Sequence, residues 1–222
     1  MQPPNAPPDS APDAPPEDQP GSPYLIAPDP SAPALSRMVT GVDQSGQSVT
    51  QAVVEERPLT IFLNGQEIVT AMTIGDYPEF LAIGFLTNQR MLAPDEVVQA
   101  VDFDAEAEAV VVRTNGTSTY EEKLARKTRT SGCAVGTVFG DMMEGLDGLR
   151  LPAAKVRVSW LRALSKAINT TPSLYLHTGA IHGTVLCEQD RPLVYMEDVG
   201  RHNAVDKVAG WMRTEGVAGG DK

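Results

Sequence analysis

The stretch Glu197-Asp198-Val199-Gly200-Arg201-His202-Asn203-Ala204-Val205-Asp206-Lys207 contains the densest group of polar residues in the folded part of this chain. It follows a short apolar run at residues 193–196, which predicts a strand. It leads into residues 203–212, where apolar side chains recur at the i, i+3, i+4, i+7 spacing of an amphipathic helix. Ligands in α/β folds bind at the turn between such a strand and helix. The stretch therefore predicts a strand–turn–helix unit with a binding site at its turn.

The turn contains groups that suit an anion. Gly200 allows a tight bend, the backbone N–H groups that follow can receive an anion, and the planar fork of Arg201 matches phosphate or carboxylate. Helix capping is the competing explanation, with Asp198 or Asn203 starting the helix and Asp206-Lys207 lying on its solvated face. Both interpretations stay open, and function is favoured because sites concentrate at loops.

The rest of the chain mixes strand and helix patterns, which predicts an α+β or α/β-like domain. Asn64-Gly65 between two apolar alternations is a strong hairpin signal, because both residues tolerate positive φ. Asp76 is the expected N-cap of the helix that follows the hairpin. Helices are expected at residues 77–91, 137–143, 158–168 and 203–212, and residues 94–96 are expected to open a further short helix. Strands are expected at residues 41–54, 57–69 (broken at Asn64-Gly65), 109–113, 174–176, 184–187 and 193–196.

Composition divides the chain into three parts. Residues 1–36 hold most of the prolines and five acidic residues but no Lys or Arg, so they predict a disordered Pro-rich tail. Residues 37–120 are expected to form an N-terminal, β-rich subdomain with a hairpin and a helix. Residues 121–222 are expected to form the core that carries the cysteine loop.

Charge and cysteine content exclude several classes of protein. A formal net charge of −11 argues against nucleic acid as the main partner, because such binders usually carry a basic face. Two cysteines are too few for a disulfide framework or a four-thiolate zinc site. No stretch has the roughly 20 apolar residues that span a bilayer, and no secretory leader is visible. We expect a soluble, cytoplasmic protein without a membrane or nucleic-acid partner.

Cys133 lies in the loop Arg129-Thr130-Ser131-Gly132-Cys133-Ala134-Val135-Gly136, before an expected helix start. The helix dipole, free N–H groups and the upstream cations would favour the thiolate, and small neighbours would let a substrate approach. A small buried side chain is the equally open alternative. Cys187 continues an apolar run and is expected to be buried. His177 and His182 could act as an acid or base beside a thiol, or could be structural.

Three motifs together resemble the formate dehydrogenase accessory sulfurtransferases, the FdhD family. They are Ser131-Gly132-Cys133-Ala134-Val135-Gly136, His177-Thr178-Gly179 with His182, and the 197–207 stretch. The resemblance implies that Cys133 accepts sulfur as a persulfide from a cysteine desulfurase. It then passes this sulfur to the molybdenum cofactor, bis-molybdopterin guanine dinucleotide, which formate dehydrogenase requires. The residues implied to bind this cofactor are Arg129, Ser131, Gly132, His182, Gly200, Arg201, His202 and Asn203.

The resemblance also implies a cytidine deaminase-like fold without zinc or another metal, and a homodimer. Two features depart from the family pattern. Gly136 stands where many members have the second cysteine of a C-x-x-C loop, which excludes a disulfide within the loop. Members usually continue well beyond the Asp206-Lys207 helix, so the chain is expected to lack their C-terminal segment.

Two other functions remain open at this stage. One is a non-covalent chaperone that binds the guanine-nucleotide cofactor during formate dehydrogenase maturation. The other is a cysteine hydrolase that pairs Cys133 with His177 or His182, although no third, orienting residue is recognisable.

Overall fold

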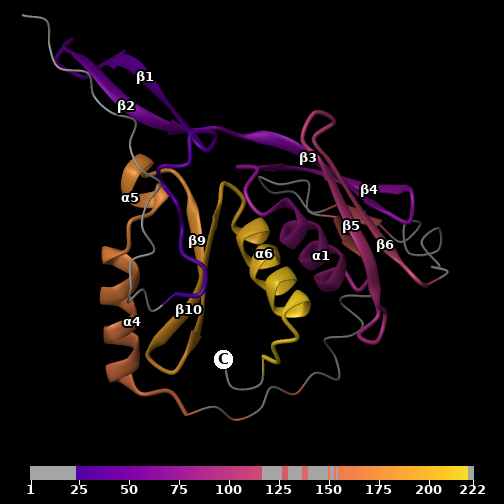
Figure 1. Cartoon of the computed structure of the whole chain (residues 1–222). Helices are drawn as coiled ribbons and strands as arrows, with labels where there is room; N and C mark the ends of the chain where they lie inside the picture. Colours follow the sequence, from indigo (N-terminus) through magenta and orange to yellow (C-terminus); the bar gives the residue numbers. More distant parts are fainter. Residues whose placement is uncertain are drawn as a thin grey trace, which may run out of the picture.

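The structure, a computed structural model, describes residues 24–116, 127–129, 137–139, 150, 153 and 155–219. Helices and several small sheets alternate along these residues, and the helices lie between and beside the sheets (Figure 1). The prediction of a mixed α+β architecture is confirmed at this level.

The largest sheet has four strands in the order β4-β3-β6-β5. They are β3 (Arg57–Leu63), β4 (Gln66–Thr73), β5 (Val98–Asp104) and β6 (Ala109–Thr114). β3 and β6 run parallel and the other neighbours antiparallel. The β3–β4 turn lies at Asn64 and Gly65, with φ of 49° and 85°, which confirms the predicted hairpin. β5 was not predicted, because its apolar residues do not alternate cleanly.

Helix α1 (Pro78–Asn88) packs on this sheet and completes the first hydrophobic core. Its Leu81 and Leu86 are buried in one cluster with β3 and β6 side chains such as Ile61 and Val110. The helix begins as predicted, but its N-cap is Tyr77, at φ 46°, and no side chain caps it. The N-cap role expected for Asp76 is therefore wrong.

A second unit consists of the hairpin β9 (His182–Glu188) and β10 (Arg191–Asp198) followed by helix α6 (Arg201–Thr214). It is the strand–turn–helix unit expected around Gly200. Its core contains Val194 and Met196 of β10 together with Val208 and Trp211 of α6.

Helices α1 and α6 lie side by side and join the two units (Figure 1). A glycine on each helix makes the close approach possible. A Cβ on Gly84 would lie 1.7 Å from the Asp206 carbonyl oxygen, and one on Gly210 would lie 1.9 Å from that of Phe80. Both distances are far inside van der Waals contact. The crossing therefore requires glycine at both positions.

The N-terminal part of the described chain also packs against the second unit. The Leu25 N–H donates to the Leu193 carbonyl at 2.7 Å, Ile26 forms a parallel bridge with Val194, and Leu35 is buried. Residues 24–36 therefore differ from the expected disordered tail, because Ile26 packs against the core of β10 and α6 and Leu35 is buried with Leu174 and Ile181. They lead into the hairpin β1 (Ser36–Val42) and β2 (Ser48–Val54), which projects from the body (Figure 1). Residues 1–23 lie outside the described residues.

Three local predictions were wrong. Residues 94–96 form a turn, which the Glu96 side chain holds by accepting from the Ala93 N–H at 3.1 Å. Residues 137–139 form strand β8 (Thr137–Phe139), which pairs antiparallel with β7 (Lys127–Arg129). Residues 174–176 belong to helix α5 (Leu174–Thr178).

Helix α4 (Val158–Thr170) confirms the helix expected at residues 158–168. None of the helices in the described ranges is both long and apolar enough to cross a membrane.

The helix crossing predicts that Gly210→Ala destabilises the fold. Alanine is the better helix former by about 1 kcal/mol, but its methyl group would overlap the Phe80 carbonyl. We expect a net loss of about 1–3 kcal/mol in the free energy of unfolding, measured by urea denaturation. Gly41→Ala is the matched control, because no atom lies within 4 Å of its added Cβ. Equal stability of the two variants would contradict the inference that the close approach of α1 and α6 requires glycine at position 210.

Candidate functional site

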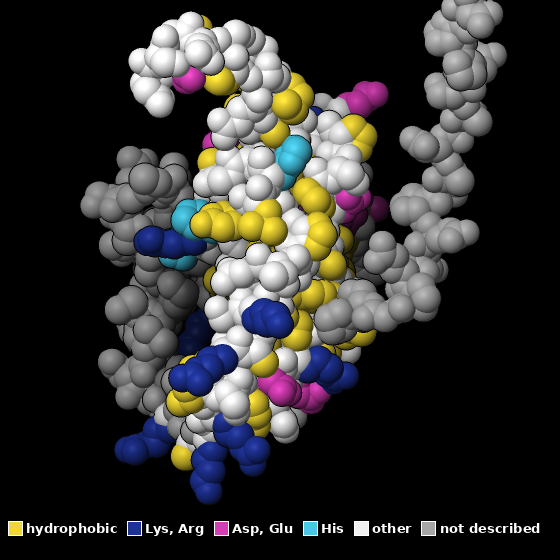
Figure 2. All heavy atoms as spheres, turned by 90° about the vertical axis from the view of Figure 1, so that its left-hand side faces the viewer, with side chains coloured by type: hydrophobic (Ala, Val, Ile, Leu, Met, Phe, Trp, Pro, Cys, Tyr) yellow, Lys and Arg dark blue, Asp and Glu magenta, His cyan; other side chains and the backbone are white. Residues whose placement is uncertain are grey.

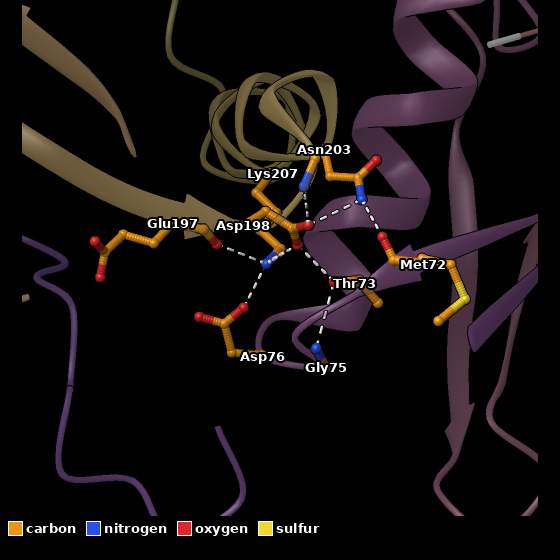
Figure 3. Close-up of polar contacts among 9 residues, drawn as sticks. Met72, Thr73, Gly75, Asp76, Glu197, Asp198, Asn203 and Lys207 are labelled. Carbon is orange, nitrogen blue, oxygen red and sulfur yellow. Dashed lines mark hydrogen bonds and ion pairs between the residues drawn. The ribbon is translucent and has the colours of Figure 1, made fainter. Parts of the chain in front are cut away.

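The 197–207 stretch surrounds a buried polar cluster, which we call the Asp198 cluster: Thr73, Asp76, Asp198, Asn203 and Lys207 (Figure 3). Lys207 is at its centre, and its side chain is fully buried. Its ammonium lies 2.6 Å from Asp198 Oδ2, pairs with Asp76, and donates to the Glu197 carbonyl oxygen at 2.9 Å. One buried cation thus holds together β10, α6 and the segment that follows β4.

Asp198 uses both carboxylate oxygens within this cluster. Oδ2 accepts a 2.5 Å hydrogen bond from Thr73 Oγ1 and receives the Lys207 ion pair. Oδ1 accepts from Asn203 Nδ2 at 2.9 Å and from the Gly200 N–H at 3.0 Å. A carboxylate with this many donors is fully satisfied, which makes its burial tolerable. These contacts fix the turn between β10 and α6.

Neighbouring carboxylates hold other elements in place. Glu197 accepts from the backbone N–H groups of Leu174 and Tyr175, at 2.8 and 3.0 Å, and so caps the start of α5. Burial raises the pKa of Glu197, and these two hydrogen bonds oppose the rise. Burial likewise raises the pKa of Asp76, and the Lys207 ammonium opposes that rise.

Asp206 is buried where α6 contacts α1. Burial raises its pKa to about 6, against the opposing effect of the hydrogen bond that Asn88 Nδ2 donates to Oδ1 at 2.6 Å. The expectation that Asp206 and Lys207 lie on a solvated helix face is wrong. Their side chains stabilise the packing of α6 instead.

The buried contacts give several members of the motif a structural role. The Asn203 amide donates to Asp198 and also to the Met72 carbonyl oxygen at 2.8 Å. The Gly200 N–H is bonded to Asp198, so it is not free to receive an anion. The anion site was predicted at the N–H groups that follow Gly200, so it stays a prediction, as does contact of Asn203 or Gly200 with a cofactor.

Arg201 and His202 are the exposed polar residues of the motif. They open α6 directly after the fixed turn. The β9–β10 register pairs His182 with Asp198, so this exposed histidine lies at the same end of the hairpin. We call Arg201, His202 and His182 the exposed rim. His177 is exposed on α5. The structure thus divides the motif into a buried frame and a rim that can contact a ligand.

Most of the cysteine loop lies outside the described residues. Ser131, Gly132 and Cys133 lie outside the described residues. Arg129 ends β7, and its partner β8 begins at Thr137. Cys187 is half-buried, and burial raises the pKa of its thiol, which disfavours the nucleophilic thiolate. In the described ranges, no three His, Cys, Asp or Glu side chains are grouped as metal ligands.

Sequence reasoning missed the part that β4 and the residues after it play in the cluster. Thr73 and Asp76 lie more than 120 positions before Asp198 and Lys207 along the chain. The sequence signal for this role was that two polar residues, Thr73 and Asp76, flank Ile74-Gly75 at the end of an apolar strand. Nothing local connected that pair with the 197–207 stretch.

Lys207→Met is predicted to destabilise the fold severely. It removes the cation and leaves the buried Asp198 and the partly buried Asp76 without their ionic partner. Breaking a buried ion pair from one side costs about 3–5 kcal/mol. Lys166→Met, on an exposed position of α4, should stay within about 0.5 kcal/mol of the parent. Similar urea midpoints for both variants would contradict the structural role of Lys207.

Asp206 gives a pH-dependent prediction. Its folded-state pKa of about 6 exceeds the ordinary aspartate value of 3.8, so ionisation opposes folding increasingly as pH rises from about 4 to about 6. Asp206→Asn keeps an acceptor for Asn88 and removes this charge. The free energy of unfolding of the variant should equal that of the parent near pH 4. At pH 8 it should exceed that of the parent by about 3 kcal/mol at most. Asp95→Asn, at an exposed turn, is the control in urea denaturation. A stability difference that does not grow with pH would contradict the prediction.

Comparisons with known proteins support the resemblance drawn from the motifs. The sulfur carrier protein FdhD of Bacillus subtilis is 29% identical over 182 residues, covering 78% of this chain and 67% of its own length. That of Wolinella succinogenes is 30% identical over 168 residues, covering 72% and 57%. That of Bacillus pumilus is 27% identical over 165 residues, covering 73% and 63%. The chain therefore spans about three fifths to two thirds of the length of these relatives.

A solved structure has a similar fold. It is that of a protein assigned as a formate dehydrogenase accessory protein, from Desulfotalea psychrophila. It is 25% identical, with a TM-score of 0.63, and the match covers 83% of this chain and 70% of that one. The model described as the FdhD/NarQ family matches residues 54–222. Since this match covers most of the chain, including the Asp198 cluster and the exposed rim, the chain belongs to the FdhD/NarQ family.

Proposed function

We propose that this chain is a sulfur carrier in the maturation of formate dehydrogenase, and that Cys133 is the residue that carries the sulfur. Family membership and the relatives named sulfur carrier protein support this proposal. The observation that carries it is the division of the 197–207 motif into a buried frame and the exposed rim. A frame of this kind holds ligand-binding side chains in place before the ligand arrives.

The exposed rim suits the anionic cargo that we propose, the molybdenum cofactor bis-molybdopterin guanine dinucleotide. Its phosphates match the planar fork of Arg201, and His202 and His182 can add hydrogen bonds. The Asp198 cluster fixes the turn that presents Arg201, so less ordering is needed on binding. The full set proposed to contact the cofactor is Arg129, Ser131, Gly132, His182, Gly200, Arg201, His202 and Asn203.

The proposed chemistry has two transfer steps. The Cys133 thiolate attacks the outer sulfur of a persulfide on a cysteine desulfurase. A new sulfur–sulfur bond forms, and the desulfurase cysteine leaves as a thiolate. In the second step the outer sulfur passes to the cofactor metal as sulfide and Cys133 leaves as a thiolate. The reduced metal supplies the two electrons that sulfane sulfur needs to become sulfide.

Several wider features belong to the same proposal. They are a cytidine deaminase-like relationship of the core, assembly as a homodimer, a cytoplasmic location, and a cysteine desulfurase and formate dehydrogenase as partners. Formate dehydrogenase is proposed as a partner because the Desulfotalea psychrophila structure is described as that of a formate dehydrogenase accessory protein.

A non-covalent cofactor chaperone is the second candidate, and one observation favours it. The exposed rim contains no cysteine, so it could bind the cofactor without any sulfur transfer. Replacing Cys133 distinguishes the two functions, because only the carrier needs this thiol.

Cys133→Ala tests the proposal, with Cys187→Ala as the matched control. After incubation with desulfurase and cysteine, mass spectrometry should find one added sulfur atom on the parent and on Cys187→Ala, and none on Cys133→Ala. In a strain without its own carrier, Cys133→Ala should reduce formate dehydrogenase activity to background. Full activity with Cys133→Ala would reject the carrier function and leave the chaperone.

A further inference from the structure

Helix α4 carries an unusual concentration of positive charge for this protein. The chain has 29 acidic and 18 basic residues, yet the run from Gly148 to Cys187 contains five Lys and Arg residues and no Asp or Glu. On α4 and directly before it, Arg157, Arg162 and Lys166 are exposed. Among the described residues none of these three pairs with a carboxylate, although Arg157 lies over the Trp160 ring, 5.4 Å from its centroid. The positive charge of this surface is therefore available to a partner.

Exposed apolar side chains lie among these cations. No α4 side chain is fully buried, and Val158 and Leu161 are 65% and 56% exposed. On the neighbouring helix α5, Leu176 is 54% exposed. We call Arg157, Val158, Leu161, Arg162, Lys166 and Leu176 the α4–α5 surface. Charged residues around an exposed apolar centre are characteristic of protein–protein interfaces.

The α4–α5 surface lies on one face with histidine side chains. Figure 2 shows basic side chains gathered toward one end of this face, histidine side chains toward the other, and hydrophobic side chains between them. Acidic side chains lie beside the basic end and also toward the opposite end and edge of this face. Glu197, at the end of β10, caps α5 through the Leu174 and Tyr175 N–H groups. A partner that covers α5 would therefore be close to the turn that presents the exposed rim.

We propose that the α4–α5 surface docks formate dehydrogenase, through an acidic surface of that enzyme that has an apolar centre. This docking proposal rests on the proposed function, because the enzyme that receives the cofactor must approach the exposed rim. Opposite charge steers such an encounter, and the apolar side chains become buried on docking.

Two other occupants fit the α4–α5 surface less well. A second copy that used the same surface would place basic helix against basic helix, so like charges would repel. Residues 1–23 of this chain are acidic, but they contain no aromatic or branched aliphatic side chain to cover Val158 and Leu161.

Charge reversal tests the docking surface. The full chain and its variants are titrated by biolayer interferometry against formate dehydrogenase purified from a strain that lacks the carrier. Arg162→Glu with Lys166→Glu should weaken binding at least tenfold at low salt and reduce its salt dependence. Leu161→Asp should weaken binding without that change in salt dependence. Arg37→Glu with Arg113→Glu makes the same charge change on β1 and β6 and should stay within twofold of the parent.

The outcomes separate the docking surface from the carrier function. Equal binding by both double variants, or no binding by the parent, overturns the docking proposal whether or not Cys133 accepts sulfur from a desulfurase. Charge-dependent binding without persulfide on Cys133 rejects the carrier and keeps the surface. The docking proposal also fails if Arg162→Glu with Lys166→Glu leaves enzyme binding intact but alters the oligomeric state or the binding to phosphatidylglycerol vesicles. The docking proposal fails equally if charge reversal no longer weakens enzyme binding once residues 1–23 are deleted.

Discussion

The buried ion pair of Lys207 with Asp76 and Asp198 is the interaction on which the rest of the structure depends. A fully buried ammonium is costly unless carboxylates and carbonyl oxygens surround it, and here they come from two separate parts of the chain, Asp76 and the adjacent Glu197 and Asp198. Because Asp76 follows β4 while Asp198 ends β10, the pair joins the four-stranded sheet to the hairpin. The N-terminal and C-terminal halves thus fold around one shared polar centre.

The close crossing of α1 and α6 determines where this polar centre lies. Gly84 and Gly210 let the two backbones approach closely, which brings the α6 residue Asp206 to Asn88 of α1. The same packing aligns Lys207 with the end of β10. The geometry of the turn at Gly200 therefore follows from helix packing together with the Asp198 hydrogen bonds, and the exposed rim follows from that turn.

Sequence patterns predicted the elements whose signal is local. The Asn64-Gly65 hairpin, the α1, α4 and α6 helices and the β10 strand each follow from turn chemistry or apolar spacing. Helix α5 was mistaken for a strand because its start depends on Glu197, which lies more than 20 positions later in the chain. Strand β8 was mistaken for a helix because its partner β7 lies on the other side of the cysteine loop. Both errors concern short segments whose conformation is set by a distant partner.

The sequence by itself determined the family, the candidate thiol at Cys133 and the importance of residues 197–207, because residue types and their spacing are local properties. Only the tertiary structure decided which members of that stretch are available to a ligand. Asp198, Asn203, Asp206 and Lys207 are buried, since each finds partners on elements far away in the chain, whereas Arg201 and His202 remain exposed. A polar residue has the same letter whether it stabilises a core or binds a ligand, and only its contacts distinguish the two roles.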